Sequence, residues 1–181
     1  IRVDPSRMAA DIQRLIFQLD EPLADPAPLN VLYVSQLAQE HGVKVLLSGA
    51  GGDDLFAGYR RHRALMLEKY WAWLPVSARS GLRYGTARLA QSGSWSRRVS
   101  KAFAQADLPP DGRLTGYFLW ADPLRVLGLF APEHRAALAG EALAAPLESY
   151  LATLPAGLPP LQRMLALEQR FFLTDHNLLY T

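Results

Sequence analysis

The chain has 181 residues, half of them apolar, which suits a single domain with a core and argues against disorder. Its formal net charge of +2 is too small to indicate nucleic-acid binding, and the lack of cysteine excludes disulfides and thiolate metal sites and fits a reducing compartment. No apolar run is long enough to cross a membrane, and a start at Ile1 rather than Met indicates a fragment of a longer protein.

The first part of the chain predicts an alternation of helices with one strand. Apolar residues recur at helical spacing, Pro-rich residues 20–28 predict a loop, and Gly42 marks a helix end. The apolar run 43–47 predicts a buried strand that leads into a glycine loop, residues 48–52. This order is typical of an α/β domain with a parallel sheet, in which ligands bind beyond the carboxyl ends of the strands. The helices predicted here are 5–19, with Asp4 as its N-cap, 30–41 and 55–73.

The remainder of the chain predicts mostly helix, so we expect one or two strands in all. Its helices are expected at 76–90, 94–106, 113–130, 145–154 and 161–172. A second short helix is expected after residues 122–123 and another starting at Pro132. The arginines between 79 and 98 form either an RNA-binding surface or solvated helix faces. No aromatic series accompanies them, which favours solvated faces. The basic run at residues 60–63 leaves the same choice, between attracting phosphate and facing solvent.

Two adjacent acids follow the glycine loop, Asp53 and Asp54. They either cap the helix that starts there, or one of them holds a Mg²⁺ that bridges to phosphate. Glycines allow close approach of the backbone, and a helix N-terminus favours a bound anion.

Three stretches of the sequence resemble one protein family. LLSGAGGDDLFAGYRRH, residues 46–62, resembles the LSGEGxDELFGGY signature in the C-terminal synthetase domain of glutamine-dependent asparagine synthetases. Residues 20–26 are similar to the DEP-x-x-DP segment of that family, and residues 172–181 to the segment before its D-[KR]-x-S-M-A stretch. The resemblance is strong over 18–63, fair over 165–181 and weak between them.

This resemblance implies an α/β fold, as a fragment of an adenine-nucleotide-hydrolase-like (PP-loop ATP pyrophosphatase) domain with one or two parallel strands. Residues 1–181 would be part of one synthetase domain, with a nucleotide-site portion at 1–70 and a helical portion at 71–181. The implied enzyme uses ATP and Mg²⁺ to form an acyl-adenylate of aspartate, which ammonia from a glutaminase domain converts to the amide. The resemblance further implies a cytoplasmic enzyme without nucleic-acid or membrane partners, and leaves a homodimer open.

The resemblance also assigns roles within the glycine loop. Ser48, Gly49 and Gly51 would contact the nucleotide together with the two acids that follow. Asp53 would hold the metal, and Asp54 stands where the family usually has Glu. Ala50 replaces an acid proposed to accept a proton in the ammonia step, so no catalytic residue is assigned and the amidation itself is in doubt.

Several parts of the family pattern are absent from these residues. The pyrophosphate-binding SGGxDS loop does not occur, the catalytic lysine would lie beyond Thr181, and the glutaminase with its Cys nucleophile is missing. We therefore expect the chain alone to be inactive. Two alternatives remain: an ATP-dependent amide ligase of the β-lactam-synthetase or peptide-modifying type, and a helical interaction module whose glycine loop is only a turn.

Overall fold

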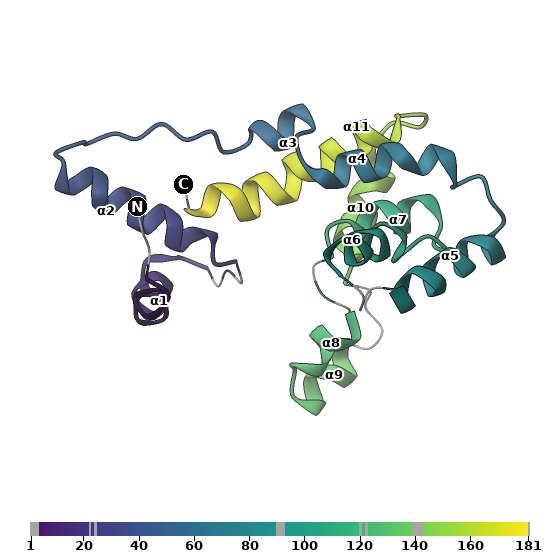
Figure 1. The fold of residues 1–181 in the computed structure, drawn as a ribbon, viewed down its shortest axis with the longest axis horizontal. Helices are drawn as coiled ribbons and strands as arrows, with labels where there is room; N and C mark the ends of the chain where they lie inside the picture. The colour runs from purple at the N-terminus through teal and green to yellow at the C-terminus, as the bar shows by residue number, and fades with distance from the viewer. Residues whose placement is uncertain are drawn as a thin grey trace. The chain divides into compact units, whose positions relative to one another are not determined.

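The structure, a computed structural model, describes residues 4–21, 23, 25–89, 93–119, 121, 123–138 and 143–180 (Figure 1). The described residues divide into two compact units, each treated by itself below. The loop unit comprises residues 1–58 and 168–181, and the helical unit comprises residues 59–167. These bounds differ from the expected portions 1–70 and 71–181, because the C-terminal segment packs on α3 of the loop unit. Residues 22, 24, 90–92, 120, 122 and 181, which our predictions include, lie outside the described residues.

The loop unit contains the helices predicted at the start of the chain. Asp4 caps the first helix as expected, since its Oδ1 accepts a hydrogen bond from the Ser6 amide at 2.9 Å. The second helix packs on the first through Tyr33, whose hydroxyl donates to Asp11 Oδ2 at 3.0 Å. It ends before Gly42, whose φ of +71° confirms the predicted glycine stop. The elements are α1 (Pro5–Gln18), α2 (Ala27–Glu40), α3 (Gly52–Phe56), the π-helical η3 (Glu168–Asn177) and η4 (Leu178–Tyr180).

The strand predicted at 43–47 is not formed. These residues run as an irregular thread from α2 to α3, and no strand occurs in the part of the chain that the structure describes (Figure 1). Val45 is 75% exposed and Leu47 98% exposed, so the prediction that this run is buried is also wrong. An apolar run forms a strand only when a neighbouring strand accepts its backbone hydrogen bonds, and the described residues supply none.

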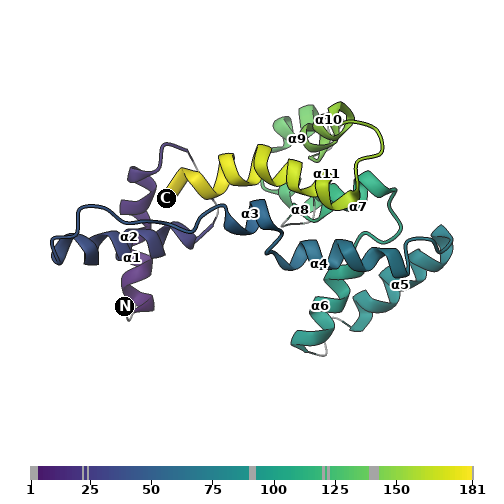
Figure 2. The same cartoon turned by 90° about the horizontal axis from the view of Figure 1, so that it is seen from above.

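The helical unit is built from pairs of packed helices. In Figure 2, α11 runs along α4 and α6 lies beside α5, in agreement with the contacts between these pairs. Its buried apolar residues include Leu65, Leu114, Leu151, Met164 and Leu167. The elements are α4 (Arg60–Leu67), η1 (Glu68–Tyr70), α5 (Val76–Leu89), α6 (Ser94–Phe103), α7 (Pro110–Gly116), α8 (Pro123–Gly128), α9 (Pro132–Leu138), α10 (Ala145–Thr153) and α11 (Pro160–Leu167).

Two predicted helices are interrupted. The stretch 55–73 divides at Ala57, which has a left-handed φ of +60° and ends α3. The stretch 113–130 divides between α7 and α8, and α8 is the second short helix expected after residues 122–123. Helical periodicity in the sequence did not reveal where α3 and α7 end, and apolar residues beside these breaks, such as Phe56 and Leu124, are largely exposed.

Some of the basic residues hold the helical unit together. Arg79 is only 9% exposed, and its guanidinium donates to the carbonyls of Ala106 and Leu108 at 2.7 and 3.0 Å. Arg83 pairs with Asp107 at 2.8 Å. The expectation of solvated faces therefore fails for Arg79, because turn carbonyls lie within reach of α5, whereas the Arg83 side chain stays 41% exposed while it pairs with Asp107.

A buried polar cluster lies in the same unit. Arg113 Nε donates to Glu68 Oε2 at 2.7 Å, and the Tyr117 hydroxyl donates to Glu68 Oε1 at 3.0 Å. Burial and the neighbouring Glu68 charge raise the pKa of Tyr117 far above its usual value. Both carboxylate oxygens of Glu68 accept hydrogen bonds from side chains of the cluster. The cluster therefore stabilises the fold and offers no open ligand position. None of the helices among the described residues combines the length and apolarity that a membrane crossing requires.

Candidate functional site

The glycine loop forms a turn at the surface of the loop unit. The Ala50 amide donates to Ser48 Oγ at 3.1 Å, and the Gly52 amide donates to the Gly49 carbonyl at 3.2 Å. Gly51 has a φ of +88°, a conformation that a side chain would strain, and it is buried. Ser48, Gly49 and Ala50 are exposed, so the loop is not covered by packed side chains.

The helix after the loop is shorter than predicted. α3 covers five residues, begins after Gly51, and ends at Phe56. One turn of helix carries little macrodipole, so the expectation that a helix N-terminus attracts an anion here is weakened. Polar contacts to a ligand at this place would have to come from the loop backbone and from individual side chains.

Asp53 lies exposed in the first turn of α3 and packs against Gly58. A Cβ placed on Gly58 would overlap Asp53 Oδ1. The Gly58 amide also donates to the Asp53 carbonyl at 3.0 Å. Gly58 therefore has to lack a side chain for Asp53 to adopt this position. Our sequence reasoning missed this requirement, although Gly58 stands in the matched signature.

Asp54, the next residue, has the opposite environment. It is 0% exposed, and the Asn177 side-chain amide donates to both of its carboxylate oxygens, at 3.0 and 3.3 Å. A buried carboxylate needs such donors to compensate for its lost hydration. The two acids that the sequence treated alike are thus separated, with one facing solvent and the other facing the interior of the loop unit.

η3 is the element that supports the loop from within the same unit. A Cβ on Gly51 would lie 3.1 Å from Leu173 Cδ1, so Leu173 packs directly against the loop backbone. His176 Nε2 lies 3.1 Å from Asp25 Oδ2, and its ring stacks on Phe172 with centroids 4.6 Å apart. The structure thus brings together the three stretches that carried the resemblance. Sequence reasoning gave no role to Asp25, His176 or Asn177.

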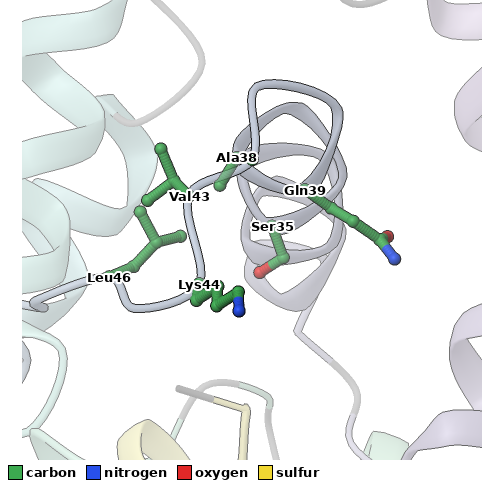
Figure 3. Close-up of a pocket in the computed structure, with 7 residues that line it drawn as sticks. Ser35, Ala38, Gln39, Val43, Lys44 and Leu46 are labelled. Carbon is green, nitrogen blue, oxygen red and sulfur yellow. The ribbon is translucent and has the colours of Figure 1, made fainter.

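Two cavities open on the loop unit. The larger, of about 600 Å³, lies between α2 and the segment that follows it (Figure 3). Ser35, Ala38 and Gln39 line it from α2, and Val43, Lys44 and Leu46 line it from that segment. The second cavity, of about 330 Å³, lies between α1 and α2. Neither is lined by Ser48 or Asp53, so both lie apart from the glycine loop.

Comparisons with known proteins agree on one family. The profile of a family described as Asparagine synthase matches residues 1–179. A putative asparagine synthetase (glutamine-hydrolyzing) of Mycobacterium tuberculosis (strain ATCC 25618 / H37Rv) is 36% identical over 80 residues, which cover 44% of this chain and 12% of that protein. Asparagine synthetase (glutamine-hydrolyzing) 1 of Bacillus subtilis (strain 168) is 35% identical over 81 residues, which cover 45% of this chain and 12% of that protein.

A shorter match has higher identity. A putative asparagine synthetase (glutamine-hydrolyzing) 1 of Methanocaldococcus jannaschii is 51% identical over 41 residues, which cover 23% of this chain and 8% of that protein. The aligned segments therefore span only a small part of the length of each relative. No solved structure matches the chain.

Proposed function

Because the chain belongs to the asparagine synthase family, we propose that it is part of the synthetase domain of an ATP-dependent, glutamine-hydrolysing asparagine synthetase. The complete protein would activate aspartate as its acyl-adenylate and release pyrophosphate. Ammonia from a glutaminase domain would then displace AMP to form asparagine. The observation that carries this proposal is the open glycine loop, followed by the exposed Asp53 carboxylate that packs against Gly58.

The residues of the loop fit a nucleotide and Mg²⁺. In the part of the chain described, no cluster of three or more His, Cys, Asp or Glu side chains could hold a metal without other ligands. Mg²⁺ is commonly bound by one or two carboxylates together with substrate phosphates, so one exposed carboxylate is a sufficient protein ligand. We assign Asp53 to the metal, and Ser48, Gly49 and Gly51 to the nucleotide. Bound Mg²⁺ would neutralise the departing pyrophosphate.

Asp54 belongs to the same site in a different way. It was expected among the nucleotide-binding residues, and its full burial and its bonds to Asn177 favour support of the loop over direct contact.

We also propose that residues 43–47 form a parallel strand when the rest of the domain is present. Val45 and Leu47 are apolar yet largely exposed. Strands on each side would pair their backbone groups, and helices on the faces of a parallel sheet would cover their side chains. The glycine loop would then lie at the carboxyl end of that strand, where α/β sheets bind their ligands.

Ala50 favours a second candidate function. Its methyl group cannot accept a proton, and it lies exposed in the loop at the position where the family usually has an acid. An amide ligase of the β-lactam-synthetase or peptide-modifying type would share adenylation but differ in the group that attacks the adenylate. Such an enzyme needs no glutaminase.

The test is ATP–pyrophosphate exchange by the complete protein. We expect exchange that depends on aspartate and Mg²⁺, and that Asp53→Asn lowers it by about a hundredfold or more. Asp175→Asn is the matched control, because Asp175 is also exposed, and it should leave exchange unchanged. Exchange with another carboxylic acid but not with aspartate would favour the second candidate, and full activity in Asp53→Asn would refute the metal assignment.

The remaining parts of the proposal follow from this activity. We expect the 181-residue chain alone to give no exchange, since the SGGxDS loop does not occur in it. A cytoplasmic location fits an enzyme that consumes ATP and has no cysteine in this portion. The glutaminase domain as ammonia source and a homodimer are expectations for the complete protein.

A further inference from the structure

Resting on the proposed function, we propose that Asn177 is a positioning residue, which orients the candidate metal ligand Asp53 by anchoring its neighbour Asp54. Asn177 lies in η3, 123 residues along the chain from Asp54, and is 8% exposed. It does not face the exposed side of the glycine loop itself. Its influence on a bound metal would pass through the backbone of α3.

The anchor belongs to a chain of polar contacts within the loop unit. Asp25 Oδ2 lies 3.1 Å from His176 Nε2, and His176 Nδ1 lies 2.9 Å from Asn177 Oδ1. Asn177 Nδ2 then reaches both oxygens of Asp54. These polar contacts join the loop before α2, the end of η3 and the start of α3.

The chemistry of Asp54 sets the direction of these contacts. A carboxylate only accepts hydrogen bonds, so the Asn177 NH₂ group must face it and the amide oxygen must face His176. His176 Nδ1 then donates to that oxygen, while Nε2 faces the Asp25 carboxylate. If the Asn177 side-chain amide were reversed, its oxygen would face the buried Asp54 carboxylate. The contacts with Asp54 and His176 therefore hold Asn177 in one orientation.

Fixing Asp54 also fixes Asp53. Successive side chains of a helix point about 100° apart, so when Asp54 is held inward Asp53 is directed outward. α3 has five residues and ends at a left-handed Ala57, so it has little helical length to define its own orientation. Leu173 and Asn177, both in η3, provide apolar and polar support on the inner side.

The experiment compares nucleotide binding with and without metal in the complete protein. Calorimetry gives the Kd for MgATP and the Kd for ATP without Mg²⁺, and circular dichroism verifies folding. We expect Asn177→Asp, which sets two buried carboxylates against each other, to weaken MgATP binding by about tenfold or more. Binding of ATP without Mg²⁺ should change much less, because only the metal depends on Asp53.

A charge swap tests the specific contact. In the double variant Asp54→Asn with Asn177→Asp, a carboxylate and an amide again face each other, so MgATP binding should return toward the wild-type value. Asn30→Asp is the matched control, because Asn30 is exposed on α2, and it should change neither constant.

The outcomes separate this inference from the proposed function. No MgATP binding by the wild-type protein would refute the proposed function. If the wild-type protein binds MgATP, the positioning role would be overturned by an unchanged Kd for MgATP in Asn177→Asp, or by a double variant that does not recover binding. If Asn177→Asp does not fold, Asn177→Ala removes the donor without adding charge, and an unchanged ratio of the two constants in that variant would overturn the role equally.

Discussion

The helical unit and the loop unit use their charged residues differently. In the helical unit, Glu68 and Arg113 are buried together, and their partners lie inside the same unit. In the loop unit, Asp53 remains at the surface while the adjacent Asp54 is buried, and apolar residues of 43–47 are exposed. The difference indicates that the buried charges of Glu68 and Arg113 compensate each other inside the helical unit, whereas the loop unit leaves the Asp53 carboxylate exposed to solvent.

The largest effect should come from breaking the buried pair of the helical unit. Arg113→Met leaves the Glu68 carboxylate buried without its cation, and it should lower the free energy of unfolding by about 3 to 5 kcal/mol. Urea denaturation of the 181-residue chain measures this loss. Arg83→Met is the control, because the Arg83 side chain is 41% exposed, and it should cost less than about 1 kcal/mol. Equal losses in the two variants would contradict a fold-maintaining role for the buried pair.

Gly58→Ala should have an intermediate effect in the loop unit. The added Cβ overlaps Asp53 Oδ1, so the Asp53 side chain has to move, with a loss of about 1 to 3 kcal/mol in unfolding free energy. In the complete protein the same change should weaken MgATP binding more than binding of ATP alone. Gly52→Ala is the matched control, because its Cβ would meet no atom within 4 Å. Wild-type MgATP binding in Gly58→Ala would show that the position of Asp53 is unimportant for the metal.

The smallest effect concerns Tyr117 and depends on pH. At neutral pH Tyr117→Phe loses a hydrogen bond to the charged Glu68 and should cost about 1 to 2 kcal/mol. The folded-state pKa of Tyr117 is raised, so its contribution is fully present below the ordinary tyrosine value of 10.0. Above that pH the unfolded chain gains by ionising while the folded chain does not, so the contribution declines.

The measurement is the difference in unfolding free energy between wild type and Tyr117→Phe. That difference should narrow as the pH rises above 10.0. The contributions of all other titratable groups to the unfolding free energy cancel, because both proteins contain these groups. A difference that is constant across this range would mean that Tyr117 ionises in the folded protein as it does in the unfolded chain.

Local features of this protein were predictable from its sequence. The Asp4 cap, the helix end at Gly42 and the glycine turn at 48–52 depend on neighbouring residues, and the structure confirms each of them. The family was also recognisable, because its motifs are continuous stretches, and the match over residues 1–179 confirms it.

Only the tertiary structure distinguished Asp53 from Asp54 and showed that Arg79 is buried. Asp54 obtains its donor from Asn177, and Arg79 obtains its acceptors from Ala106 and Leu108, all far away in the sequence. The strand at 43–47 failed for the same reason, since a strand requires a partner that its own residues cannot supply. Periodicity and caps act between neighbours along the chain, whereas the burial of a charge or a strand depends on which distant groups come to face it.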